Sequence, residues 1–283
     1  MNTFTEITKT EIQNSAAITS AAKIWAIENL EYLNKPMKLF GSSLKVEKGA
    51  HAFETYVMYL QPADKVAAVT ICAGAKMAGC KKPCLISSGQ LGMTVGQNAA
   101  TKRTILLLLR GDWFNAQLLR EIDAAEKKSE KPGNKPALFR LNGTSDLDWS
   151  HIINARPNSN FYDYTKIEKR LAKKSSNYSV TFSASMYSEQ SRRAFRRAVI
   201  NGEVIAVAFN TKNLASDQIQ IPNNLENFDK TDLRNLDAPK TIGALTRKGS
   251  SKKSRALENE SEKSFFVTAK NYADFSNIIA SAK

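Results

Sequence analysis

Apolar side chains recur along the chain with two different spacings. In residues 11–33 they fall three or four positions apart, as on one face of a helix. The Lys35-Pro36 step ends that segment, because a residue that precedes proline disfavours helical backbone. Short β-rich apolar runs predict strands instead. These predicted strands cover residues 56–60, 68–72, 137–142, 160–164, 178–184, 204–209 and 241–246.

Amphipathic segments lie between the predicted strands. They cover residues 98–128, 149–155, 166–174, 188–200 and 272–282, and an Asn- and Asp-rich loop is predicted over residues 211–236. Strands that alternate with helices are typical of parallel βαβ units, and the chain has no glycine-rich dinucleotide fingerprint that would favour an open sheet. The sequence therefore predicts an α/β protein with a partial or full (β/α) barrel. The barrel is expected over residues 66–250, after an N-terminal helical and β extension (1–65) and before a C-terminal strand and helix (251–283).

Positive charge is in excess. The 283 residues include 41 Lys and Arg against 27 Asp and Glu, a formal net charge of +14. An excess of this size indicates a polyanionic partner, with nucleic acid, DNA or RNA, as the leading candidate. No apolar run approaches the ~18 residues that a membrane-spanning helix needs, and the first residues do not resemble a signal peptide. We therefore expect a soluble cytoplasmic protein that makes no membrane contact.

Three cysteines fall within thirteen positions, at Cys72, Cys80 and Cys84. Thiolates are soft ligands that select zinc, copper(I) or iron–sulfur clusters, and three of them leave one coordination position open. The spacing therefore predicts a metal or cluster site in a loop after the predicted strand at 68–72. The alternative is three reduced, half-buried cysteines without a ligand. His51 or His151 is a candidate fourth ligand, although a lone histidine is more often a surface or capping residue.

Polar residues follow several predicted strands. Active sites of (β/α) barrels lie at the carboxyl ends of the strands, so these residues are expected to line one cleft with the cysteine loop at its mouth. Asp146, Asp163 and Lys166 are the candidate catalytic groups, and Asn142, Gly143, Thr144 and Ser183 are the candidate cofactor-binding residues. The alternatives are a helix cap at Asp146 and a surface ion pair between Asp163 and Lys166.

Two basic stretches are candidate nucleic-acid contacts. Arg192, Arg193, Arg196 and Arg197 lie on one helical face, with only Glu189 as a nearby acid. Residues 240–255 hold six basic residues and no acid, and Lys248, Lys252 and Lys253 are the contacts predicted there. The alternative is that the arginine face is merely solvated.

Five ordered motifs resemble those of the bacteriophage gene-product-88 family, over residues 66–250. They are the cysteine loop, the stretch from Leu141 to Asp146, the stretch from Phe161 to Lys166, Thr181-Phe-Ser183, and the stretch from Asp232 to Asp237. That family in turn resembles the radical S-adenosylmethionine enzymes, whose barrel carries a three-cysteine [4Fe-4S] cluster. The resemblance implies that Cys72, Cys80 and Cys84 hold such a cluster. It also implies that Asn142-Gly143-Thr144 holds the amino group of S-adenosylmethionine, although the cysteine gaps of seven and three residues depart from the usual three and two.

Three functions are compatible with these observations. The first is a phage-encoded metal- or iron–sulfur-dependent enzyme, of the radical S-adenosylmethionine kind, that acts on nucleic acid or a nucleotide in the host cytoplasm. The second is a zinc-containing base-exchange enzyme of the transglycosylase kind, in which Asp146 or Asp163 is the nucleophile. The third is a non-catalytic nucleic-acid-binding protein with a structural metal.

Overall fold

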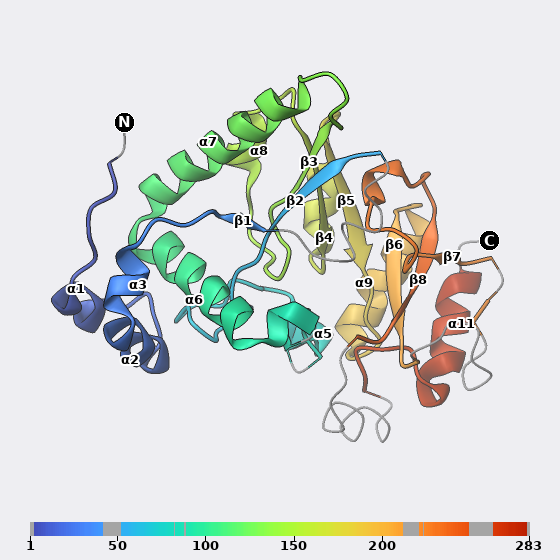
Figure 1. Ribbon diagram of the computed structural model, residues 1–283. Helices are drawn as coiled ribbons and strands as arrows, with labels where there is room; N and C mark the ends of the chain where they lie inside the picture. The colour runs from blue at the N-terminus through green and yellow to red at the C-terminus, as the bar shows by residue number, and fades with distance from the viewer. Residues whose placement is uncertain are drawn as a thin grey trace. The chain divides into compact units, whose positions relative to one another are not determined.

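The chain forms two compact units in the computed structural model (Figure 1). The structure describes residues 3–41, 52–81, 83–87, 89–211, 221–222, 224–248 and 263–281. Unit 1 comprises Met1–Ala73 and Gly89–Phe161, and unit 2 comprises Gly74–Ser88 and Tyr162–Lys283. The segment with two of the three cysteines therefore belongs to unit 2, although both chain neighbours of that segment belong to unit 1.

The protein is a mixed α/β protein with an eight-stranded sheet in the order β1-β2-β3-β4-β5-β6-β8-β7. The strands are β1 (Phe40–Gly41), β2 (Glu54–Met58), β3 (Ala137–Arg140), β4 (Asn160–Thr165), β5 (Tyr178–Ser183), β6 (Ile205–Phe209), β7 (Glu226–Asn227) and β8 (Ile242–Thr246). β1 is antiparallel to β2, whereas β2–β3, β3–β4, β5–β6, β6–β8 and β7–β8 are parallel pairs. The predicted α/β class is confirmed, and closure into a barrel stays a prediction.

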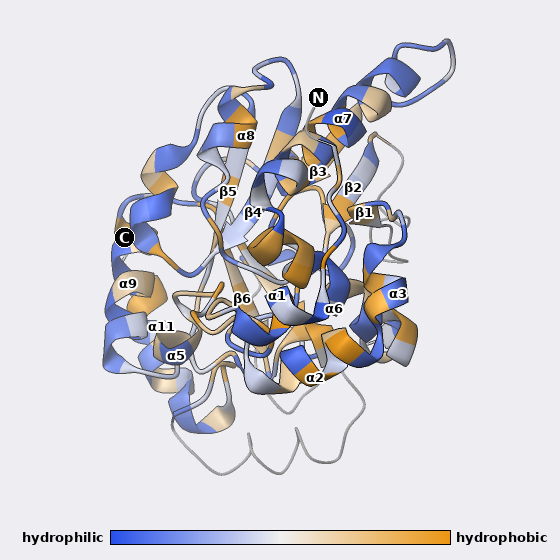
Figure 2. Cartoon of the chain, turned by 90° about the vertical axis from the view of Figure 1, so that its left-hand side faces the viewer, coloured by the Kyte–Doolittle hydropathy of each residue, from blue (hydrophilic) through white to orange (hydrophobic). Residues whose placement is uncertain are grey.

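Helices precede and separate the strands of unit 1. They are α1 (Lys9–Asn14), α2 (Ser20–Glu28), α3 (Leu30–Asn34), the 3-10 turn η2 (Gly89–Gly92), α6 (Thr94–Leu109), α7 (Gly111–Ser129) and α8 (Ser150–Asn154). The amphipathic segment predicted over 98–128, with a break expected near Gly111, consists of two helices that meet at Arg110. α7 buries Phe114, Leu118 and Ile122 on one face, and Figure 2 shows hydrophobic and hydrophilic residues alternating along it. None of the described helices is long and apolar enough to cross a membrane.

The strand predicted at residues 68–72 does not form. Only isolated bridges occur there, from Ala67 to Ile18 and from Cys72 to Asp146. The Asp146 amide donates to the Ile71 carbonyl at 3.0 Å, so this segment is held by the turn after β3 instead of by a continuous ladder.

A buried lysine joins two helices of unit 1. Lys102 of α6 has no exposed surface, and its Nζ donates to the carbonyls of Tyr32 and Lys35 at 2.5 and 2.6 Å. These carbonyls lie at the end of α3, where backbone acceptors lack helical partners and the helix dipole favours a cation. Burial, followed by repulsion from the Lys35 ammonium, lowers the pKa of Lys102 to about 8.

The helices and 3-10 turns of unit 2 lie before and after β4 in the chain. α5 (Ala75–Ala78) and η1 (Leu85–Ser87) precede β4. The elements that follow it are η3 (Glu168–Lys173), α9 (Glu189–Ile200), η4 (Arg234–Leu236), η5 (Ala269–Asn271) and α11 (Tyr272–Ala280). The core covers one face of the strands. There Phe182 of β5 and Val207 and Phe209 of β6 belong to one apolar cluster with Phe195 of α9 and Phe275 of α11.

The opposite face of the unit 2 strands is covered by the chain that precedes β8. A side-chain carbon at Gly243 would lie 2.1 Å from ring atoms of Phe228, so the ring packs directly on the glycine backbone. The Arg234 guanidinium lies over the other side of this ring, 3.6 Å from its centroid. Asp232 accepts hydrogen bonds from the Tyr162 and Tyr164 hydroxyls at 3.0 and 3.2 Å.

Removal of the Lys102 charge should change how stability depends on pH. The unfolded chain keeps the ordinary lysine pKa of 10.5, so between pH 8 and 10.5 the unfolded state binds more protons than the folded state. The free energy of unfolding of the wild type should therefore gain roughly 1–3 kcal/mol from this group as pH rises through that window. Denaturant unfolding of wild type and Lys102→Met at pH 7.5 and 10 measures this gain, which the variant should lack. Equal pH dependence in both proteins would contradict the prediction.

Gly243→Ala should destabilise unit 2, because the added methyl group collides with a ring that is held on both sides. Overpacking of this kind costs about 1–3 kcal/mol or more. Gly111→Ala is the matched control, since nothing lies within 4 Å of an added methyl group there. Thermal unfolding should show a clear fall in Tm for the first variant and no fall for the second. A Gly243→Ala protein as stable as wild type would show that Phe228 moves freely.

Candidate functional site

Asn142 organises the turn that follows β3. Its Oδ1 accepts from Ser145 Oγ at 2.8 Å, from the Leu147 amide at 2.9 Å and from Trp149 Nε1 at 3.3 Å. Its Nδ2 donates to the Leu147 carbonyl at 3.0 Å. The side chain is 3% exposed, so its hydrogen-bonding capacity is used to fold its own turn.

The other predicted residues of this turn also contact the backbone of unit 1. The Gly143 amide donates to the Met58 carbonyl at 3.0 Å, and an added side-chain carbon would lie 2.6 Å from that oxygen. Thr144 Oγ1 donates to the Leu60 carbonyl at 2.5 Å. Asp146 is buried and forms a parallel bridge with Cys72. The glycine is required by close approach of β2, and the threonine anchors the turn to the end of that strand.

The prediction of a metal or [4Fe-4S] site at the cysteines is wrong. Within the described ranges, no group of three or more His, Cys, Asp and Glu residues is placed to hold a metal ion. The Cys72 sulfur lies in unit 1, where it accepts from the Ala63 amide at 3.3 Å, and the Cys80 sulfur lies in unit 2, 3.9 Å from the Ala75 carbonyl. Cys84 belongs to unit 2, is partly buried and forms no disulfide. A thiol that donates to a carbonyl is protonated, whereas a metal ligand is a thiolate.

The cofactor predictions depended on this site and are therefore wrong as well. Neither an iron–sulfur cluster with S-adenosylmethionine nor the alternative zinc ion has a ligand set among the residues that the structure describes. Of the two candidate fourth ligands, His51 lies outside the described residues, and the His151 ring packs near Trp149 with centroids 5.8 Å apart.

Unit 2 brings two of the predicted site residues together. Lys166 directly follows β4, and its Nζ lies 2.7 Å from Oγ of Ser183, the last residue of β5. The ammonium also lies over the Phe265 ring, 4.4 Å from the centroid. Asp163 alternates with Tyr162 and Tyr164 along β4, is 2% exposed, and accepts from the Tyr178 hydroxyl at 3.4 Å. Lys166 and Ser183 therefore form a polar pair at the carboxyl ends of two strands.

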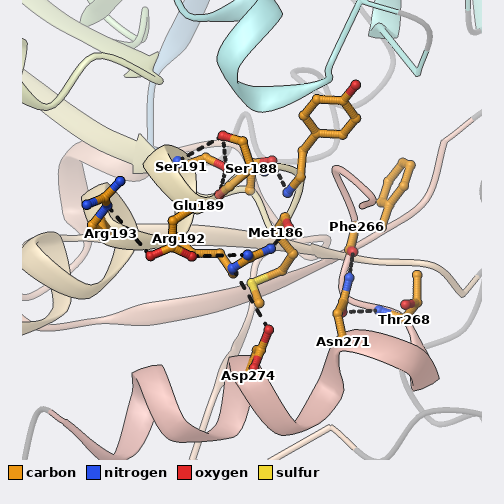
Figure 3. Close-up of polar contacts among 12 residues, drawn as sticks. Met186, Ser188, Glu189, Ser191, Arg192, Arg193, Phe266, Thr268, Asn271 and Asp274 are labelled. Atoms are coloured by element: carbon orange, nitrogen blue, oxygen red, sulfur yellow. Dashed lines mark hydrogen bonds and ion pairs between the residues drawn. The ribbon is translucent and has the colours of Figure 1, made fainter. Parts of the chain in front are cut away.

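The arginines of α9 have more acidic partners than the local sequence indicates. Figure 3 shows Arg192 between Glu189 of its own helix and Asp274 of α11, at 3.1 and 3.9 Å, and Arg193 near Glu189 at 3.6 Å. Arg197 binds both carboxylate oxygens of Glu168 in η3, which lowers the pKa of that carboxyl. Arg196 is exposed, and no partner for it is found within the described part of the chain. The predicted four-arginine face is thus largely ion-paired.

Positive charge is concentrated in one of the two units. Unit 2 has 24 Lys and Arg against 13 Asp and Glu, a net charge of +11, whereas unit 1 has 17 against 14, a net charge of +3. Residues 168–203, which contain η3 and α9, hold eight basic residues and three acidic ones. Because Arg197 pairs with Glu168 across the two elements, η3 and α9 present one basic surface, which we call the η3–α9 surface. Its exposed members include Lys169, Lys173, Arg193 and Arg196.

The basic stretch after β8 is described only in part. Lys248 is exposed and donates to Asp229 Oδ1 at 2.5 Å. Lys252 and Lys253 lie outside the described residues.

Sequence reasoning missed Arg247, the residue that directly follows β8. It is 8% exposed, and its Nε and Nη1 have no hydrogen-bond partner within the described residues. The only signal was its place after the apolar run 241–246, where Lys166 stands in the same relation to the run 160–164.

The Asp232–Asp237 motif contributes to folding. Arg234 is 3% exposed, and Nη2 donates to the Thr231 carbonyl at 2.8 Å while Nη1 lies 3.1 Å from Asp237 Oδ2. Burial raises the pKa of the Asp237 carboxyl to about 6, although Arg234 acts in the opposite direction. The arginine therefore finds compensation for its charge within the motif itself.

These features define a mixed α/β protein whose second unit is strongly basic. The chain belongs to the gene product 88 family, whose model matches residues 28–262. The predicted phage gene-product family is thereby confirmed, and the match begins earlier than residue 66. No curated protein and no solved structure matches the chain. The further likeness to radical S-adenosylmethionine barrels is not confirmed.

Asn142→Ala should destabilise the protein, because the change leaves the buried donors of the turn without their acceptor. The expected loss is roughly 2–4 kcal/mol of unfolding free energy. Asp148→Ala is the control, since Asp148 is exposed and accepts from Ser150 in the same turn, so its loss should cost about 1 kcal/mol or less. Chemical denaturation measures both. An Asn142→Ala protein with wild-type stability would instead favour the predicted ligand-binding role.

Proposed function

We propose that this protein binds nucleic acid through unit 2, with the η3–α9 surface as the main contact for the phosphate backbone. The observation that carries the proposal is the distribution of charge, with a net +11 in unit 2 against +3 in unit 1. Lys and Arg that neutralise phosphates release condensed counterions, and this term supplies most of the affinity of non-specific binding.

The ion pairs of α9 decide which residues contribute. Arg197 is held by Glu168 through two oxygens, so it must give up that pairing before it contacts a phosphate. Lys169, Lys173 and Arg196 are exposed, and among the described residues no acidic partner is found for Lys169 or Arg196. These three side chains are therefore the preferred phosphate contacts of the surface, and their flexible stems favour binding to the backbone over reading of base edges.

Catalysis on nucleic acid is the second candidate, and one contact favours it. A lysine amine 2.7 Å from a serine hydroxyl, as in Lys166 and Ser183, can activate that hydroxyl when the amine is neutral. The Phe265 ring lies 4.4 Å from the same nitrogen, in the arrangement of a cation–π contact. An ammonium donates to Ser183 and to anions but accepts no proton. The contacts therefore favour binding over nucleophilic catalysis.

Replacement of Lys169, Lys173 and Arg196 by Gln in one variant should reduce the salt dependence of binding. We expect the slope of log K against log salt to flatten by two to three units on duplex DNA, at about 0.9 per phosphate contact. The matched control removes three exposed charges from unit 1, by Lys9→Gln, Lys127→Gln and Lys131→Gln, and should leave the slope nearly unchanged. Fluorescence anisotropy with duplex and single-stranded oligonucleotides at several salt concentrations measures both. Equal slopes in wild type and the unit 2 variant, or equal changes in both variants, would overturn the proposal.

A further inference from the structure

We propose that the carboxyl ends of β4, β5 and β8 in unit 2 form a phosphate-binding site, with Arg247 as its principal contact and Lys166, supported by Ser183, as a second one. The inference rests on the proposed function in that it names the group recognised, a phosphate of a nucleic acid strand or of a free nucleotide. It concerns residues other than those of the η3–α9 surface.

Arg247 is a buried cation for which no acidic partner is found among the described residues. Its amide donates to the Thr211 carbonyl at 2.8 Å, which fixes the backbone, yet its guanidinium leaves Nε and Nη1 without acceptors among the described residues. The same two atoms of Arg234 also lack a hydrogen-bond acceptor, but that guanidinium has a carboxylate, a carbonyl and an aromatic ring beside it. The Lys102 ammonium has two carbonyls. Burial of an uncompensated cation is costly, so an anion that fills its donors would stabilise the folded state.

The register of the strands places these groups on the same side of the sheet. Ser183 is the partner of Ala206, and Ala206 is the partner of Gly243. Side chains two positions apart on a strand point to the same face, so Gly243, Leu245 and Arg247 share the face of Ser183. The Lys166 ammonium contacts Ser183 and so lies on that face as well. The apolar core occupies the other face, through Phe182, Val207 and Phe209.

One short segment links the lysine to the arginine. Phe265 packs on the Lys166 ammonium, and Val267, two residues later, forms a parallel bridge with Phe209. Phe209 is in turn the register partner of Thr246, which precedes Arg247. Val267 and Thr246 lie on opposite sides of Phe209, so the path from Phe265 to Arg247 covers three residues of extended chain and two strand spacings, a backbone separation on the order of 14 Å. Cations carried by backbone positions this far apart suit a ligand that carries more than one phosphate better than they suit a single phosphate ion.

The chemistry of the two cations favours phosphate. A guanidinium presents parallel N–H donors that match two phosphate oxygens, and an ammonium adds a point charge. The nearest acid shown beside β8 is engaged elsewhere, because Asp229 accepts from the Thr246 amide at 2.8 Å and from Lys248. Nothing in these contacts reads a base.

Thermal unfolding of the full-length protein tests the site, with pyrophosphate as the probe and sodium chloride used to hold ionic strength constant. Pyrophosphate should raise the Tm of the wild type, because a ligand that binds only the folded state stabilises it. Arg247→Met should lose that shift and bind at least tenfold more weakly, and Lys166→Met should show a smaller loss. Lys230→Gln is the matched control, since it removes one positive charge from an exposed side chain of unit 2 that belongs to neither proposed contact, and it should respond like the wild type.

The stability of the variants without ligand distinguishes a ligand-binding arginine from a purely structural one. Without pyrophosphate, Arg247→Met should unfold at the same temperature as the wild type or a higher one, because the change removes a buried charge that has no partner. A lower Tm, or failure to fold, would show that the protein itself compensates Arg247 and would overturn the proposal. A wild-type pyrophosphate shift in Arg247→Met would overturn it as well.

Oligonucleotides distinguish the two sources of phosphate. If the wild type has a higher affinity for a single-stranded oligonucleotide than for pyrophosphate, and Arg247→Met loses this difference, the ligand is a strand phosphate. If the affinity for pyrophosphate is equal or higher, the ligand is a free nucleotide. The proposed function is judged separately, since the salt slope of the η3–α9 variant depends on other side chains. A protein without the pyrophosphate site that still shows that slope would keep the proposed function and lose this inference.

Discussion

The packing of the Phe228 ring on Gly243 is the contact on which the second face of unit 2 depends. With no side chain at position 243, the ring lies directly on β8, and the Arg234 guanidinium lies 3.6 Å from the ring centroid on its far side. The same stretch of chain places the Asp232 carboxylate where it accepts hydrogen bonds from the hydroxyls of Tyr162 and Tyr164 on β4. One glycine thus fixes how the chain between β7 and β8 crosses the strands. Leu245 and Arg247 follow on that face toward the carboxyl end.

Three of the buried cations in the described part of the chain differ in how their charge is balanced. Lys102 donates to the free carbonyls at the end of α3. Arg234 contacts an aromatic ring, a backbone carbonyl and the Asp237 carboxylate. The chain therefore balances both charges. Arg247 is almost as buried, but two of its donors have no acceptor in the described structure. A charge that folding does not balance is a stability cost, and such costs are concentrated at positions where a ligand supplies the balance.

The apolar pattern of the sequence predicts much of the sheet. The runs at 137–142, 160–164, 178–184, 204–209 and 241–246 correspond to β3, β4, β5, β6 and β8 within two residues at each end. These strands are buried, so their composition carries the signal. The run at 68–72 does not form a strand because its backbone groups have other partners. The Ala68 and Ile71 amides donate to the carbonyls of Ala17 and Ala63, and the Ile71 carbonyl accepts from Asp146 in the turn after β3. No local window contains that information.

The candidate site was less predictable, since it depends on partners far apart in the sequence. The spacing of Cys72, Cys80 and Cys84 does not reveal where each sulfur points, and the sulfurs of Cys72 and Cys80 lie near backbone groups of their own units. The charge of α9 was likewise misjudged, because Glu168 and Asp274 reach it from elements 21 and 85 residues away from Glu189. By contrast, Lys166 was found from sequence, since a polar residue directly after a buried strand is placed at the edge where ligands bind.

The two basic features of unit 2 act over different distances. Exposed lysines and arginines of the η3–α9 surface attract phosphates over about a Debye length, ~8–10 Å at physiological salt, and this attraction weakens as salt increases. Arg247 is 8% exposed and lies in a medium where salt screens little, so the phosphate contact proposed for it would persist at ionic strengths that abolish the first. In this proposal, attraction by the surface increases the rate of encounter, whereas the buried arginine acts mainly on the rate of release. The proposed roles would thus combine a salt-sensitive surface that gathers polyanions with a salt-resistant contact that selects a correctly placed phosphate.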